Sequence, residues 1–205
     1  MAKSDFISGT VLEFKIPNGL GYAYCKILDF RSIREFDGVL AKVYDHIADE
    51  SLSDLAVLAN TDWLFGAVRM PGLPNTRGKG AWKHKGVMVA GEDADIPDFK
   101  YSPKASPLIE NESTITNWYV NRNISQLLDD KICSYDQVKH LEDTVLMSEY
   151  SIEIRTAMEY YRIHEMDVSK YFDLTELGYN NIYRAMMNVP IYKTIPKKIR
   201  GKALC

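Results

Sequence analysis

Two apolar runs joined by a glycine-containing turn constrain the start of the chain, in residues 9–30, GTVLEFKIPNGLGYAYCKILDF. Both runs, 11–16 and 22–28, are rich in β-branched and aromatic residues, which suit a pleated, half-buried surface. The turn between them, 17–21, contains asparagine and glycine, which tolerate a positive φ. We therefore predict a β-hairpin that is structural, as part of a small barrel or a curled antiparallel sheet.

More strands and loops are predicted up to about residue 124. Four segments have the length and composition of strands: 38–46, 62–70, 81–91 and 114–123. Residues 51–60 have the spacing of a short helix. The glycine- and proline-rich segment 71–80 is expected to be a loop, and 95–107, with its three prolines, to be extended or irregular.

Helical periodicity replaces the short strands after residue 125. A capping-box pattern at 134–137 predicts a helix with Val138, Leu141 and Val145 on one stripe. Two further helices are predicted from apolar residues at helical spacing, first Tyr150, Ile154, Ala157, Met158 and Tyr161, then Ile182, Ala185, Met186 and Val189. Strands followed by helices indicate the α+β class. We expect a β-rich domain at 1–124 and a helical region with a basic tail at 125–205, either separate or packed together as one domain.

Composition points to a soluble globular protein. The chain has 205 residues, of which 46% are hydrophobic and 26% charged, and a net charge of −3. That mild charge argues against both a disordered chain and a nucleic-acid binder as a whole. No apolar run approaches the ~20 residues of a membrane-spanning helix, and the N-terminus lacks the apolar core of a signal peptide. Three widely spaced cysteines, Cys25, Cys133 and Cys205, predict free thiols in a reducing, cytoplasmic setting.

Motifs of known catalytic or metal sites do not appear in the sequence. The four histidines, His46, His84, His140 and His164, are not paired at metal-ligand spacing. The segment 72–80, GLPNTRGKG, has the wrong glycine spacing for a phosphate-binding loop and lacks its hydroxyl residue. We therefore expect no catalytic residue, metal or cofactor, although an active site assembled from distant positions stays open as an alternative.

Two kinds of charged segment are candidate binding sites. Acidic loops suit docking against a basic partner, and the candidates are Asp45, Asp49, Glu50, Asp54, Glu92, Asp93 and Asp95. Basic residues around an aromatic ring could instead grip single-stranded nucleic acid, and these candidates are Arg77, Lys79, Trp82, Lys83 and Lys85. The tail, 192–205, is basic as well and could be a partner arm. Ordinary solvated loops and a solvated terminus are the alternatives.

The hairpin resembles the opening of the immunity protein 26 family, bacterial proteins thought to neutralise polymorphic toxins. The positions that carry the resemblance are Gly9, Val11, Phe14, Ile16, Pro17, Gly19, Tyr22 and Tyr24, with Trp82, Gly86, Pro97 and Phe99 downstream. The resemblance covers about residues 7–100 and stops before the helical third.

This resemblance implies an immunity-type protein that neutralises a cognate toxin by stoichiometric binding, without a catalytic residue. The hairpin would then be scaffold, with specificity on the loops. A single-stranded nucleic-acid-binding barrel and an enzyme with a dispersed active site are the alternative functions.

Overall fold

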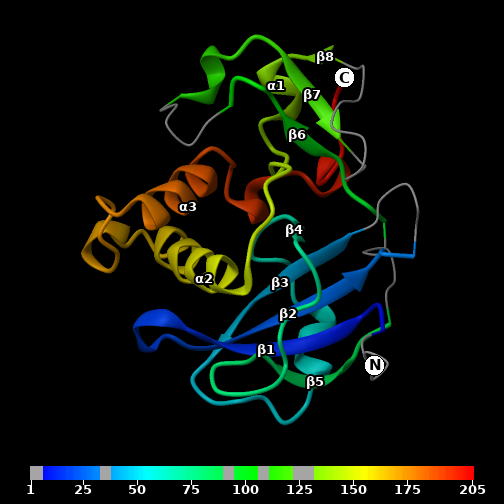
Figure 1. Ribbon diagram of the computed structural model, residues 1–205, viewed down its shortest axis with the longest axis vertical. Helices are drawn as coiled ribbons and strands as arrows, with labels where there is room; N and C mark the ends of the chain where they lie inside the picture. The colour runs from blue at the N-terminus through cyan, green and yellow to red at the C-terminus, as the bar shows by residue number, and fades with distance from the viewer. Residues whose placement is uncertain (1–6, 33–37, 90–94, 106–110, 122–131) are drawn as a thin grey trace.

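The computed structural model describes residues 7–32, 38–89, 95–105, 111–121 and 132–205, arranged as two antiparallel sheets with helices beside and between them (Figure 1). The larger sheet has the strand order β4-β3-β2-β1-β5. Its strands are β1 Thr10–Ile16, β2 Gly21–Asp29, β3 Val39–Ala48, β4 Val68–Met70 and β5 Lys83–Val87. The smaller sheet has the order β6-β7-β8, with strands Phe99–Tyr101, Trp118–Asn121 and Ile132–Cys133.

In the described part of the chain, three α-helices follow the eight strands, which confirms the predicted α+β class. They are α1 Tyr135–Val138, α2 Glu149–Ile163 and α3 Leu177–Met187. Short 3₁₀ turns connect the elements: Pro17–Gly19, Ala56–Asn60, Glu112–Thr114, Val168–Lys170, Tyr192–Thr194 and Lys197–Ile199. The larger sheet is curled and open, so the barrel alternative of the prediction is not realised.

The predicted hairpin is confirmed as β1 and β2, paired in register from Thr10↔Ile27 to Ile16↔Gly21. Its turn needs the residues that the sequence supplies, because Asn18 and Gly19 both have a positive φ, of 62° and 73°. Gly21 has a φ of 101°, and a side chain there would collide with the carbonyl oxygen of Ala48 in β3. The close approach of β2 to the end of β3 therefore requires glycine at this position.

Alternation along β1 and β2 gives the larger sheet two buried faces. One face carries Leu12, Phe14 and Cys25 and packs against α2, in the largest hydrophobic cluster of the molecule. The other face carries Val11 and Tyr24, which pack with residues of the 52–63 connection. Apolar residues of α2 and α3 belong to the same cluster as the sheet, so this core spans both parts of the chain: Ile152, Ile154, Ala157, Met158, Tyr161 and Met186.

Four local predictions need correction. In the segment 51–60, predicted as a helix, only Ala56–Asn60 is helical, and it is a 3₁₀ turn. In the segment 62–70, predicted as a strand, only Val68–Met70 is a strand, and a single bridge joins Trp63 to Tyr44 before it. The helix predicted after Ser134 has its capping box, with the Ser134 N–H donating to the Gln137 side chain at 2.9 Å. It nevertheless ends at Val138, and Val145 is 67% exposed rather than on a buried stripe.

The fourth correction concerns the cysteines. Cys133 and Cys205 form a disulfide, with Cα atoms 5.7 Å apart, and only Cys25 is free. The sequence hides this pair because 72 positions separate the two residues. The disulfide forms because the C-terminal tail returns to the smaller sheet and ends beside β8 (Figure 1). The prediction of three free thiols was wrong, whereas Cys25 is a buried core residue as expected.

Candidate functional site

Four of the acidic candidates lie along the end of β3 and the connection that follows it. Asp45, Asp49, Glu50 and Asp54 are all exposed. The Asp54 carboxylate accepts a hydrogen bond from the N–H of Ala56 at 2.9 Å and so fixes the start of the 3₁₀ turn. Asp95 is also exposed but lines a separate groove, and Glu92 and Asp93 lie outside the described residues. The structure therefore places one acidic stretch, 45–54, on the surface.

A buried polar network beneath this stretch holds it against the hairpin. The hydroxyl groups of Tyr24 and Ser51 both donate to the carboxylate of Glu13, at 3.0 Å and 2.5 Å. The Tyr24 oxygen in turn accepts from the N–H of Leu52 at 2.7 Å, and Lys85 lies 3.5 Å from the same carboxylate. Burial raises the pKa of Tyr24 to about 12, so the hydroxyl stays protonated and able to donate. The hairpin therefore holds the acidic stretch in place through hydrogen bonds to Ser51 and Leu52.

The basic candidates do not form one surface. Arg77, Lys79 and Lys83 are exposed, but Lys85 is partly buried in its contact with Glu13. Trp82 is only 1% exposed and belongs to the core. Its ring stacks on Phe14 with centroids 4.6 Å apart, and its indole N–H donates to Glu153 of α2 at 2.8 Å. A nucleic-acid base could stack on Trp82 only if this ring left the core.

The basic tail is docked on the protein rather than extended from it. The Arg200 guanidinium donates to both carboxylate oxygens of Asp62, at 2.9 and 2.8 Å, and lies 4.5 Å from the centre of the Tyr192 ring. The N–H of Ala203 donates to Asp98 at 2.8 Å. Together with the larger sheet the tail lines a groove of about 1210 Å³. Lysines and carboxylates both face this groove, so it has no single sign of charge.

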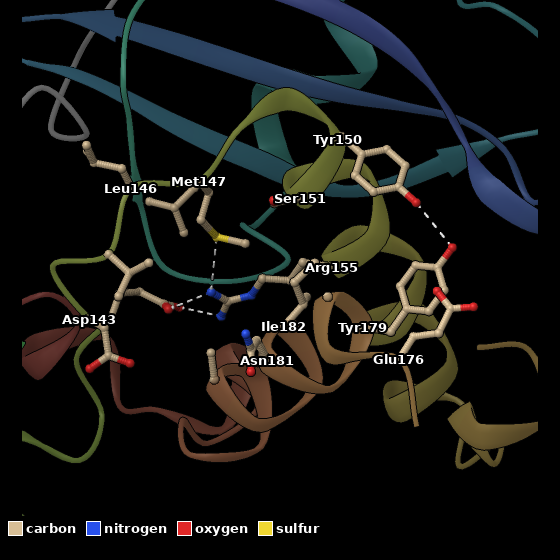
Figure 2. Close-up of a pocket in the computed structure, with 15 residues that line it drawn as sticks. Asp143, Leu146, Met147, Tyr150, Ser151, Arg155, Glu176, Tyr179, Asn181 and Ile182 are labelled. Carbon is tan, nitrogen blue, oxygen red and sulfur yellow. Dashed lines mark hydrogen bonds and ion pairs between the residues drawn. The ribbon is translucent and has the colours of Figure 1, made fainter. Parts of the chain in front are cut away.

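A second cavity lies between α2, α3 and the segment that precedes α2 (Figure 2). Its volume is about 410 Å³, within the range of ligand-binding pockets. Apolar side chains form much of its wall: Val68, Val145, Leu146, Met147, Ile182 and Ala185. Tyr150 and Tyr179 close one end, with their hydroxyl oxygens 3.1 Å apart. We refer to this cavity as the α2–α3 pocket.

A buried ion pair, Arg155–Glu142, lies in the α2–α3 pocket. The two guanidinium nitrogens of Arg155 each donate to one oxygen of Glu142, both at 2.8 Å. Arg155 is only 3% exposed, lies 4.5 Å from the centre of the Phe65 ring, and has Glu159 as a second carboxylate at 3.7 Å. This geometry neutralises the charge of Arg155 within the protein.

Glu142 also joins the helical region to the N-terminal part of the chain. Its Oε1 accepts a hydrogen bond from the N–H of Gly66 at 3.1 Å. A side chain at Gly66 would lie 2.7 Å from the Cγ of Glu142, so the contact requires glycine.

Asp143 lies at the end of the pocket opposite the two tyrosines (Figure 2). Burial raises the pKa of Asp143 to about 7, a rise that nearby Lys100 opposes and that the carboxylates of Glu112 and Glu142 reinforce. Lys100 is itself fully buried, and its ammonium donates to Glu112 at 2.7 Å and to the carbonyl of Asn188 at 3.2 Å. The lysine charge therefore acts on Glu112 through a direct hydrogen bond and on Asp143 through charge attraction.

Sequence reasoning missed this pocket and its charged residues. The sequence pattern predicts a helix through Leu141 and Val145, whereas the structure has an irregular segment at 141–147 that carries Glu142 and Asp143. The available signals are Arg155 and Glu159, two charged residues within the apolar pattern of α2.

In the ranges that the structure describes, no three His, Cys, Asp or Glu side chains are grouped so that they could hold a metal ion. Within those same ranges, no helix combines the length and the apolar character needed to cross a membrane.

Comparison with known proteins relates the N-terminal part of the chain to immunity proteins. Residues 7–108 match the model of a family described as Immunity protein 26. Over this segment the chain is similar to the Immunity protein 26 family, which confirms the predicted resemblance. The segment contains the whole larger sheet and the acidic stretch, but only Val68 of the α2–α3 pocket. No curated protein and no solved structure matches the chain.

Proposed function

We propose that this protein is an immunity protein that neutralises a cognate bacterial toxin by forming a stoichiometric complex, and that it is not an enzyme. The observation that carries the proposal is the match of residues 7–108 to the Immunity protein 26 family. Inhibition of this kind needs a binding surface and no chemical step. The alternative of a single-stranded nucleic-acid binder is weaker, because its only aromatic candidate, Trp82, lies in the core.

The acidic stretch is the first candidate for the toxin-binding surface. Asp45, Asp49, Glu50 and Asp54 are exposed, and a rigid network through Glu13 supports the connection that carries them. Exposed charges of one sign increase the rate of encounter with a partner of the opposite sign. The toxin would accordingly present a basic surface to this stretch.

We propose that the protein acts in the cytoplasm. The cysteine argument no longer supports this location, since Cys133 and Cys205 are joined and disulfides persist mainly in oxidising compartments. The proposal rests instead on the family match, because a protein that neutralises a toxin by binding has to meet that toxin where the toxin acts, which we take to be the cytoplasm.

The test uses the protein product of the gene beside the one for this chain. We expect the two purified proteins to elute as a 1:1 complex, and expression of the neighbouring gene alone to be toxic. In the triple variant Asp45→Asn, Asp49→Asn, Glu50→Gln, the association rate at low salt should fall by about tenfold.

A matched control removes three exposed acids elsewhere, at Asp136, Glu165 and Asp173. Its association rate should stay within about twofold of the wild type, since these charges lie outside the acidic stretch. Absence of any complex would contradict the proposed function. A complex whose association rate is unchanged in the triple variant would contradict only the assignment of the acidic stretch.

A further inference from the structure

We propose that the α2–α3 pocket is a docking site for the toxin, and that it receives a large apolar side chain followed by a lysine or arginine. The inference rests on the proposed function, because it names the toxin as the occupant. It assigns a binding role to the helical region, beyond the segment that matches the Immunity protein 26 family.

The first observation is an apolar rim that faces solvent. Val145 is 67% exposed, Tyr150 57% and Leu146 48%, and all three line the pocket. Large apolar side chains exposed together around a cavity mark an interaction surface. A small molecule inside the cavity would leave most of this rim in water, whereas a protein surface would cover the rim and fill the cavity at once. The rim therefore favours a protein as the occupant.

The second observation is the size of the cavity. Its volume of about 410 Å³ is large enough to hold a whole side chain. Aromatic and other large anchors that fill such pockets contribute most of the affinity in protein complexes. Together with the apolar wall of Leu146, Met147 and Ile182, this size indicates a large apolar anchor.

The third observation is the balance of charge. Glu142, Asp143 and Glu176 line the pocket, against Arg155 alone. Because Arg155 makes two short hydrogen bonds to Glu142, it has little attraction left for an anion. Glu176, an exposed carboxylate, supplies most of the remaining negative charge, and Asp143 adds to it only in part, because its pKa is raised to about 7. The pocket is therefore acidic on balance, which favours a cation beside the apolar anchor. This charge preference separates the proposed occupant from an acidic or neutral segment.

The fourth observation is that the walls of the pocket are already fixed. Arg162 of α2 donates to the carbonyl groups of Met186 and Val189, both at 2.9 Å, and so ties the end of α3 to α2. The Arg155–Glu142 pair fixes the third wall to α2. A preorganised cavity loses less conformational entropy when a partner docks.

The decisive experiment compares two substitutions of opposite charge at one rim residue. Val145→Lys and Val145→Glu remove the same apolar contact but add opposite charges beside the expected cation. The dissociation constant of the toxin complex should rise by about tenfold or more in Val145→Lys and by clearly less in Val145→Glu. The matched controls are Ile132→Lys and Ile132→Glu, at a residue of β8 that is 58% exposed and belongs to neither the pocket nor the acidic stretch. Both controls should bind like the wild type.

A second measurement tests the chemistry of the pocket without the toxin. Methyl resonances of Met147 and Ile182 are followed while 4-phenylbutylamine or 4-phenylbutyrate is added to the full-length protein. The amine should shift both methyl resonances saturably and bind about tenfold more tightly than the carboxylate.

The outcomes separate the two proposals. A toxin complex that is as tight with both Val145 variants as with the wild type overturns the docking site but leaves the proposed function intact. Failure of the toxin to bind the wild type overturns the proposed function, and with it the toxin as occupant of the pocket. Equal or absent binding of the two small probes overturns the preference for an apolar group with a cation.

Discussion

Replacing Glu142 by Gln tests the buried ion pair in the α2–α3 pocket. The glutamine has the size of the glutamate and keeps one oxygen that can accept from the N–H of Gly66 and from one Arg155 nitrogen. Its amide NH2 cannot accept from the other Arg155 nitrogen, so the variant removes the charge and one hydrogen bond of the pair. Arg155 is 3% exposed, and its nearest remaining carboxylate would be Glu159 at 3.7 Å. Breaking a buried pair by removing one partner typically costs 3–5 kcal/mol, because an uncompensated charge stays buried.

We expect Glu142→Gln to lower the free energy of unfolding by about 3 kcal/mol, at the lower end of that range because Glu159 remains. The assay is urea unfolding followed by circular dichroism. Arg155→Met and the double variant complete a double-mutant cycle, which isolates the interaction between the two side chains. The double variant should be more stable than the sum of the two single losses predicts, because it buries no unpaired charge.

An additive cycle would refute this reasoning, since it would mean that the two charges do not interact. A loss below about 0.5 kcal/mol in Glu142→Gln would refute it as well, because a surface pair gives values of that size. The matched control is Asp136→Asn, which removes an exposed carboxylate from its pair with Lys139. It should leave the free energy of unfolding nearly unchanged.

Three further predictions concern pH, the disulfide and truncation. The pKa of Asp143 is raised to about 7, so the folded state holds this proton more tightly than the unfolded state. The Asp143 carboxyl group therefore lowers the free energy of unfolding as pH rises from about 4 to 7. In Asp143→Asn the free energy of unfolding should depend less on pH in this range; an unchanged slope would contradict the raised pKa. Cys205→Ser removes a crosslink over 72 positions, for which chain entropy gives a loss of about 4 kcal/mol. A reducing agent should destabilise the wild type but not this variant, and an equal response of both proteins would contradict the disulfide. A chain ending at residue 108 should show no cooperative thermal unfolding, because the sheet loses the cover of α2; a sharp transition would contradict this expectation.

Local signals were enough to predict several elements. The hairpin follows from strand alternation and from a turn whose residues tolerate a positive φ, both of which lie within 22 consecutive residues. The helices α2 and α3 follow from apolar spacing, and Pro190 lies just beyond the end of α3. In these segments the local preference and the tertiary environment agree.

Long-range contacts decided the features that were missed. Trp82 lies among basic residues in the sequence, but Phe14 and Glu153 place it in the core. The capping box at Ser134 starts a helix as predicted, yet the chain leaves it after one turn. Residue order alone does not show the contacts of Trp82, since Phe14 and Glu153 lie far from it along the chain. The α2–α3 pocket was missed for the same reason, as its wall extends from Val68 to Ala185.

The division into a domain at 1–124 and a helical region at 125–205 can be argued from the same long-range contacts. We propose that the two parts unfold as one cooperative unit. The family segment alone would expose one face of its larger sheet, including Leu12 and Phe14, which pack in one cluster with Ile152 and Met158 of α2. Glu142 also accepts a hydrogen bond from the N–H of Gly66, where a side chain would lie 2.7 Å from the Cγ of Glu142. If the toxin binds both the acidic stretch on the sheet and the pocket on the helices, this rigid connection would hold the two surfaces at a fixed separation. Binding at one surface would then place the second in reach of its partner without further ordering.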